Sequence, residues 1–162
     1  MSANHIISVL VENKAGVLAK ISGLFSRRGF NIESLAVGPT EDEQVSRITM
    51  TVNAESHSIE QIVKQLYKLI NVIKIQELDP SNIVERELVL IKVSTENNTR
   101  PEILEIVSIF RANIVDVSKK SLVIEITGTS RKTQALEELL KPYGILELVR
   151  TGKIALNRGM KK

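Results

Sequence analysis

The sequence predicts an α+β protein in which the order strand–helix–strand–strand–helix–strand occurs twice. Short runs of β-branched residues alternate along the chain with stretches of helical apolar spacing. The polar segment Asp79-Pro80-Ser81-Asn82 interrupts this pattern as a linker would, and the same order of elements returns after it. The 162 residues suffice for two units of roughly 80 residues each, a size that is marginally stable alone. We therefore expect the units to be stabilised by mutual packing or by oligomerisation.

Six elements are expected before the linker. They are a strand at His5–Val11, a helix at Val17–Arg28, strands at Asn31–Val37 and Val45–Val52, a helix opened by a Ser58/Gln61 capping box, and a strand at Val72–Leu78. The first helix should end at Gly29, because glycine readily adopts the left-handed conformation of helix C-termini. The strand at 45–52 alternates between an apolar face of Ile48, Met50 and Val52 and a face of Arg47, Thr49 and Thr51. The second helix has one apolar stripe, formed by Ile59, Ile62, Val63, Leu66 and Ile70.

The elements after the linker follow the same order. They are a strand at Leu88–Val93, a helix opened by a Thr99/Glu102 capping box, strands at Ile114–Val117 and Leu122–Ile126, a helix capped by Ser130, and a strand at Ile145–Val149 that Lys153–Leu156 extends or follows. Pro101 suits the first turn of its helix, where the missing N–H costs nothing, and Pro142 stops the last helix. The apolar stripes of the two helices are Ile103, Ile106, Val107 and Phe110, and Leu136, Leu139 and Leu140.

The two halves also share a short sequence pattern at the end of their first helix. Phe25 closes a helix before Asn31-Ile32 opens a strand, and Phe110 precedes Asn113-Ile114 in the same way. We interpret the chain as two tandem ferredoxin-like βαββαβ units, residues 1–79 and 80–162. In that arrangement two helices cover one face of each antiparallel sheet, and the other face and the edge strands remain for pairing between units or chains.

Composition removes several classes of function. The chain has no cysteine and two histidines, His5 and His57, so disulfides, thiolate or histidine metal sites and catalytic triads lack their residues. No phosphate-binding or dinucleotide-binding glycine motif is present. No apolar stretch approaches the ~20 residues of a membrane span. We therefore expect an intracellular chain with no metal site and no membrane contact, and we find no group of residues specific enough for acyl, phosphoryl or hydride transfer.

The charge distribution does not favour a nucleic-acid partner. Residues 1–79 carry 8 basic and 9 acidic side chains and residues 80–162 carry 14 and 10, which gives the net charge of +3. The basic C-terminal end is interpreted as a solvated terminus. RNA-binding modules share the expected element order, but they stack bases on sheet aromatics, and the strands at 5–11 and 45–52 contain none. No helix-turn-helix segment is visible.

The segment Glu12-Asn13-Lys14-Ala15-Gly16-Val17-Leu18 combines several features of a small-molecule site. Gly16 allows backbone to approach a ligand closely, and the free N–H groups of a first helical turn favour a carboxylate. The amide of Asn13 can both donate and accept hydrogen bonds, as an amino acid requires, and Asn31 offers a second amide. The apolar Val17, Leu18 and Ile32 could surround an aliphatic side chain. A plain helix entry, with Gly16 as the turn and Asn13 as a local cap, explains the same residues.

At these residues the chain resembles the small, regulatory subunit family of acetohydroxyacid synthase (acetolactate synthase). The resemblance rests on Glu12-Asn13-x-x-Gly16, Arg28-Gly29-Phe30-Asn31-Ile32-Glu33-Ser34-Leu35, Val84-Glu85-Arg86-Glu87-Leu88 and Gly128-Thr129-Ser130. It covers essentially the whole chain. It implies that residues 1–79 are an effector-binding and dimerising ACT domain and that residues 80–162 are an ACT-like C-terminal domain.

The resemblance also implies a function and a site. Members of this family perform no chemistry; they activate a large catalytic subunit that holds thiamine diphosphate, magnesium and FAD, and they confer feedback inhibition, usually by valine, in branched-chain amino acid synthesis. The effector lies between two ACT domains, against Asn13, Ala15, Gly16, Val17 and Leu18 of one chain and Asn31 and Ile32 of the other. The second half has no Asn-x-x-Gly loop at its first strand–helix junction, so no second amino-acid site is expected there.

Two alternatives remain open. The chain could be a stand-alone amino-acid-sensing ACT regulator of another enzyme or of transcription, and the source compartment could be the cytoplasm or a plastid stroma. The preferred effector among valine, leucine and isoleucine is also left open.

Overall fold

The computed structural model describes residues 3–160, with the side chains of Ser56 and His57 excepted. The chain forms two compact units. The first contains the residues up to Val84 and those from Lys153 onward, and the second contains Glu85–Gly152. The predicted fold class is confirmed, because each unit contains one four-stranded antiparallel sheet in the βαββαβ order.

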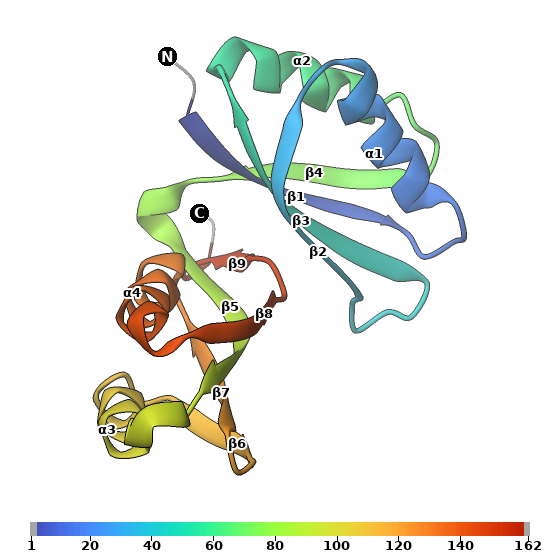
Figure 1. Cartoon of the computed structure of the whole chain (residues 1–162). Coiled ribbons are helices and arrows are strands. Elements are labelled where there is room, and N and C mark those ends of the chain that lie inside the picture. The colour runs from blue at the N-terminus through green and yellow to red at the C-terminus, as the bar shows by residue number, and fades with distance from the viewer. Residues whose placement is uncertain (1–2, 161–162) are drawn as a thin grey trace. The chain divides into compact units, whose positions relative to one another are not determined.

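The first unit has strand order β2-β3-β1-β4. Its elements are β1 (Ala3–Glu12), α1 (Val17–Arg27), β2 (Asn31–Pro39), β3 (Val45–Ala54), α2 (Ser56–Leu66) and β4 (Val72–Leu78). Both helices lie over the same face of the sheet (Figure 1). The alternation predicted for β3 is confirmed, since Ile48, Met50 and Val52 belong to the core beneath the helices. The opposite face of β3 is buried as well, because Thr49 and Thr51 are only 3% and 4% exposed.

The second unit repeats this topology with strand order β6-β7-β5-β8. Its elements are β5 (Ile83–Ser94, which begins in the first unit), α3 (Arg100–Ile109), β6 (Asn113–Val117), β7 (Ser121–Gly128), α4 (Ser130–Leu140) and β8 (Ile145–Arg150). Short 3₁₀ turns cover Pro80–Asn82, Glu96–Asn98 and Lys141–Tyr143. Its own core lies between the sheet and the two helices and includes Ile91, Ile103 and Ile124, all fully buried.

Two predicted helix starts and one predicted capping bond are wrong. Helix α2 begins at Ser56 with Glu55 as its N-cap, so no Ser58/Gln61 capping box forms. Thr99 is the N-cap of α3, but its hydroxyl donates to the Glu96 carbonyl instead of capping the first turn. The cap of α4 is Thr129, whose hydroxyl accepts from the Lys132 N–H. Each error is a local choice between neighbouring polar residues, which backbone packing decides.

Two residues predicted for apolar stripes lie outside the core. Helix α2 ends at Leu66, so Ile70 lies in the following turn and is 89% exposed. Leu139 of α4 is 50% exposed, while Leu136 and Leu140 are buried. In both cases the buried arc of the helix is narrower than the run of apolar residues suggested.

The turn from the first helix to the second strand has the same geometry in both units. Gly29 has φ +72°, its N–H donates to Ser26 O, and the Phe30 N–H donates to Phe25 O. These are the two bonds of a Schellman C-cap, and the Phe25 and Phe30 rings meet edge to face at 6.3 Å, as the motif favours. The second unit forms the same bonds with Arg111 in the glycine position, at φ +54°.

The predicted match of Phe25 with Phe110 is therefore wrong by three positions. Phe110 is itself the cap residue of α3, so its counterpart is Arg28, whereas the residue that corresponds to Phe25 is Val107. Asn31 and Asn113 do correspond, since each follows the left-handed residue by two positions and opens a strand.

The units divide the chain differently from the predicted ranges 1–79 and 80–162. A ninth strand, β9 (Ile154–Asn157), belongs to the first unit. It pairs with β5, and its Ala155 packs in a small cluster with Ile6, Leu78 and Ile83. The linker also continues into the first unit, because β5 begins at Ile83 and the unit boundary follows Val84.

Candidate functional site

The glycine loop joins the end of β1 to the start of α1, at residues 13–16. Gly16 is the N-cap of α1 in the left-handed conformation, with φ +84° and ψ −9°, and no side chain caps the first turn. A Cβ on Gly16 would meet nothing within 4 Å, so the position is open space. The exposed loop therefore presents the positive end of α1 without a competing side chain.

Asn13 ties this loop to the β2–β3 turn. Its backbone N–H donates to Gln44 O at 2.7 Å, and its side-chain Nδ2 donates to Glu43 O at 2.8 Å. The turn is itself ordered, since the Asp42 carboxylate accepts from the Gln44 N–H. The Asn13 side chain thus has a fixed direction, with Oδ1 left to accept a bond from a ligand. The bonds from Asn13 to this turn could not be predicted from the sequence, because they are tertiary contacts across about 30 residues of chain.

A surface ion pair lies beside the loop. The Lys14 ammonium is 2.7 Å from the Glu12 carboxylate. The hydrogen bond and the charge of Lys14 lower the pKa of Glu12 below its ordinary value. The pair neutralises both charges next to the start of α1, so the electrostatic preference of the loop for an anion comes from backbone amides.

The apolar residues predicted for the site differ in what they can contact. Val17 is 4% exposed and belongs to the core of the first unit, whereas Leu18 is 39% exposed on the outer side of α1. Ala15 is exposed in the loop. Leu18 and Ala15 are therefore the side chains that the first unit offers to a ligand at the loop, with Val17 contributing backbone.

Asn31 and Ile32 lie at the opposite end of the sheet. Asn31 pairs with Asn53 near the end of β3, while Glu12 pairs with Val45 at its beginning. At about 3.4 Å per residue the separation along β3 is on the order of 25 Å. One chain therefore cannot bring Asn13 and Asn31 to the same small ligand; of the predicted site residues, it brings together those from 13 to 18.

The equivalent junction in the second unit is filled by its own side chains. The Arg100 guanidinium donates to Ser118 O at 2.6 Å and to Lys119 O and Thr95 Oγ1 at 3.3 Å. Pro101 removes one N–H from the first turn of α3. The positions that are open around Gly16 are thus occupied in the second unit.

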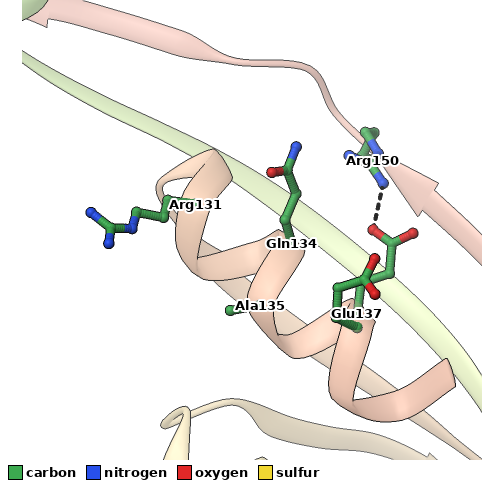
Figure 2. Close-up of a pocket in the computed structure, with 6 residues that line it drawn as sticks. Arg131, Gln134, Ala135, Glu137 and Arg150 are labelled. Carbon is green, nitrogen blue, oxygen red and sulfur yellow. Dashed lines mark hydrogen bonds and ion pairs between the residues drawn. The ribbon is translucent and has the colours of Figure 1, made fainter. Parts of the chain in front are cut away.

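The second unit also carries a surface hollow of about 450 Å³ on α4 and β8. Figure 2 shows Arg131, Gln134 and Ala135 along α4, with Arg150 of β8 paired to Glu137 at 3.0 Å. Arg131 points away from Arg150. Because the two cations do not converge and one is already neutralised, the hollow has no arrangement suited to an anion.

The described residues were compared with the needs of a metal site and of a membrane span. Within this range no group of three His, Asp or Glu side chains is close enough to hold a metal ion. His5 bonds through Nδ1 to Glu77 and through Nε2 to the Ala54 carbonyl, so it joins neighbouring strands of the sheet. The side chain of His57 lies outside the described residues. None of the described helices is both long and apolar enough to cross a membrane.

Two family models match the chain. A model described as the AHAS small subunit-like ACT domain matches residues 7–74, and a model described as the small subunit of acetolactate synthase matches residues 86–159. The boundary between the two matches falls close to the boundary between the structural units.

Similar proteins match the chain over almost its whole length. The acetolactate synthase small subunit of Mycolicibacterium smegmatis is 57% identical over 155 residues, which cover 96% of this chain and 91% of the relative. The probable acetolactate synthase small subunit of Archaeoglobus fulgidus is 55% identical and covers 98% and 99%. The crystal structure of the acetolactate synthase small subunit from Thermotoga maritima superposes with a TM-score of 0.92 at 45% identity, covering 98% of this chain and 99% of that one.

Proposed function

Because the chain belongs to the family of acetolactate synthase small subunits, we propose that it activates a catalytic large subunit and makes that subunit sensitive to inhibition by valine. The regulatory role goes with membership of the family. The activation and the identity of the effector are the proposal. Bacterial and archaeal relatives favour the cytoplasm over a plastid stroma as its place of action.

The observation that carries the effector proposal is the uncapped start of α1. An amino acid carboxylate would accept bonds from the amides of the first turn of α1, where no side chain competes and the Val17 N–H makes only a long bond of 3.4 Å to Lys14 O. The ammonium group would donate to Asn13 Oδ1, whose orientation the bond from Nδ2 to Glu43 O sets. A branched aliphatic side chain would rest on Leu18 and Ala15. These three features together select a small aliphatic amino acid.

A second copy of the chain completes the site in this proposal. Strand β2 is at the edge of the first sheet, and an antiparallel pairing of two β2 strands about a two-fold axis reverses their direction. The Asn31 end of the partner would then lie beside the Pro39 end of this chain. That end carries the β2–β3 turn, to which Asn13 is bonded. Dimerisation would thus bring together two groups of residues that one chain holds on the order of 25 Å apart.

The two sheet edges of the first unit differ in a way that favours β2 for this pairing. On the opposite edge, the Tyr67 hydroxyl accepts from the Ile75 N–H at 3.0 Å and donates to the Ile75 carbonyl at 3.2 Å. These backbone groups of β4 are therefore not available to another strand. An edge strand whose outward backbone groups are already hydrogen-bonded pairs less readily with another strand than one whose groups are unbonded.

Inhibition in this scheme is a shift of population. An effector that contacts both chains favours one relative orientation of the paired ACT domains, and it can inhibit only by as much as its affinities for the two orientations differ. Couplings of ~1–3 kcal/mol, or roughly 5–150-fold, are typical.

Reconstitution tests the proposal directly. The purified chain is mixed with its catalytic subunit, pyruvate, thiamine diphosphate, magnesium and FAD, and acetolactate formation is measured with and without valine, leucine and isoleucine. We expect higher activity with the chain than without it, inhibition by valine, and no turnover by the chain alone. An equal rate with and without the chain would reject the activating role, and a rate that no branched-chain amino acid lowers would reject the effector role.

A further inference from the structure

The chain crosses between its two units twice. It leaves the first unit after Val84 and returns to it at Lys153. The segment Lys153–Arg158, here called the return strap, therefore connects the end of the second unit to the surface of the first. The strap follows Gly152 and β8 directly in the chain, so it is the second covalent connection between the units.

The far end of the strap is anchored firmly to the first unit. The Arg158 N–H donates to Asn82 O at 2.9 Å, and its Nε donates to Ile83 O at 3.0 Å. Between these bonds and the crossing, Ala155 is 5% exposed and packs on Ile6 and Leu78 of the sheet. These contacts fix the strap to β1, β4 and the start of β5.

The near end of the strap is bonded to a different strand. The Lys153 N–H, in the first residue after the crossing, donates to Ser34 Oγ at 2.8 Å across 119 residues of sequence. Ser34 lies in β2, two residues after Ile32, at the point where the register of β2 against β3 shifts. Strand bulges of this kind are places where the backbone can adjust. The strand that carries Asn31 and Ile32 is thus hydrogen-bonded to the residue through which the chain returns.

We propose that Ser34 is a positioning residue that couples β2 to the second unit through the return strap. This inference rests on the proposed function, because it assumes that an effector contacts Asn31 and Ile32. When the effector draws the start of β2 toward the partner chain, the Ser34 hydroxyl moves with it and the Lys153 amide follows. The second unit then experiences the change as a displacement of its C-terminal connection. Effector binding needs no contact with Ser34, whereas transmission of the binding event does.

The test separates binding from transmission. Ser34→Ala removes the acceptor with little change in volume, Ser34→Thr restores a hydroxyl, and Ser22→Ala is a matched control because its hydroxyl bonds within its own helix to Ala19 O. For each full-length variant, valine affinity is measured by calorimetry and residual acetolactate synthase activity is measured at saturating valine with the catalytic subunit. We expect Ser34→Ala to bind valine within twofold of the unaltered chain but to leave about fivefold more residual activity, the lower end of common allosteric couplings.

The rescue and the control decide between coupling and a general structural role. Ser34→Thr and Ser22→Ala should both return the residual activity of the unaltered chain. Equal residual activity in Ser34→Ala and the unaltered chain would overturn the coupling while leaving the proposed function intact. A parallel loss of valine affinity in Ser34→Ala, without rescue by Ser34→Thr, would also overturn it. If the unaltered chain binds no valine, leucine or isoleucine, both the proposed function and the coupling fail.

Discussion

The two strand–helix junctions, residues 12–18 in the first unit and 94–100 in the second, occupy the same place in the same topology but have different surroundings. In the first unit the N-cap is a left-handed glycine without a capping side chain. In the second, Asn97 and Asn98 are left-handed, and the Arg100 guanidinium reaches back to Ser118 O and Lys119 O. No side chain caps the first turn of either helix, but only in the second unit does an arginine of the first turn bond to the neighbouring strand turn.

The two units also differ in the hydrogen bonding of their buried threonine hydroxyl groups. Thr133 in the second unit donates to the buried Glu87 carboxylate, whereas within residues 3–160 the buried Thr51 hydroxyl of the first unit has no hydrogen-bond partner. In the second unit the buried threonine hydroxyl lies within bonding distance of the Glu87 side chain and the Ser130 carbonyl, and in the first unit the buried Thr51 hydroxyl is unsatisfied. Substitutions made in pairs, one in each unit, test how far this difference extends.

Gly16→Asp should have the largest effect. The side chain is strained at φ +84°, and its carboxylate repels the carboxylate of an amino acid at the start of α1. We expect valine affinity, measured by calorimetry, to fall at least about 100-fold, or ~2.7 kcal/mol, with activation of the catalytic subunit retained. Asn98→Asp introduces the same negative charge at a left-handed position of the other junction and should leave valine affinity unaltered. Unchanged valine sensitivity in Gly16→Asp would remove the loop from the site.

Thr133→Val should have the next largest effect, which is a loss of stability. Glu87 is 6% exposed. The loss of a hydrogen-bond donor to this buried side chain should lower the free energy of unfolding by about 2 kcal/mol. Thr51→Val is the matched change in the first unit. It replaces an unsatisfied hydroxyl with a methyl group and should alter stability by less than about 0.5 kcal/mol or increase it. Urea denaturation measures both, and equal destabilisation of the two variants would contradict the contrast.

Asn31→Ala should weaken valine binding about tenfold, or ~1.4 kcal/mol, because the partner chain loses the amide that it contributes to the shared site. Asn113→Ala changes the corresponding first residue of β6 in the second unit. Calorimetry should show an unaltered affinity for that variant. Full affinity in Asn31→Ala would argue against a site that two chains share.

The Schellman turns allow a smaller test. Gly29→Ala places a Cβ at φ +72° and should cost about 1 kcal/mol of unfolding free energy. Arg111→Gly removes a Cβ at φ +54°, and the relief is partly offset by the greater freedom of glycine in the unfolded chain, so a gain of about 0.5 kcal/mol is expected. Thermal unfolding should show shifts of opposite sign. Shifts of the same sign would mean that the two turns are not equivalent.

The smallest effect concerns the ion pair beside the loop. Lys14→Met should raise the pKa of Glu12 toward its ordinary value, because the hydrogen bond and the charge that lower it are removed. A carboxylate with a lowered pKa contributes stability above its unfolded pKa and loses that contribution as the pH falls through its folded pKa. The variant should therefore lose this acid-side dependence. NMR titration of Glu12 measures the pKa, and an unchanged value would mean that Lys14 does not perturb it in solution.

Much of the fold could be predicted from local patterns. Strand β3 is predicted by the alternation of apolar and polar residues, and α1 is predicted by helical apolar spacing that ends at Gly29. Both patterns arise from the geometry of the backbone over a few residues. Helix starts were predicted less well, since Ser58 and Glu55 compete for the N-cap over three positions and the core decides between them. Of the candidate site, residues 13–18 were found together because they are neighbours in sequence.

The sequence by itself determined the order of the main helices and strands, the repetition of the unit and the glycine at the start of α1, since each follows from residue type and spacing over short distances. Only the tertiary structure decided that Asn31 lies across the sheet from Asn13, that Tyr67 closes the β4 edge, and that the Lys153 amide meets Ser34 119 positions away. The physical reason is that strand pairing and single hydrogen bonds between distant residues depend on how the whole sheet assembles, and no local propensity encodes that.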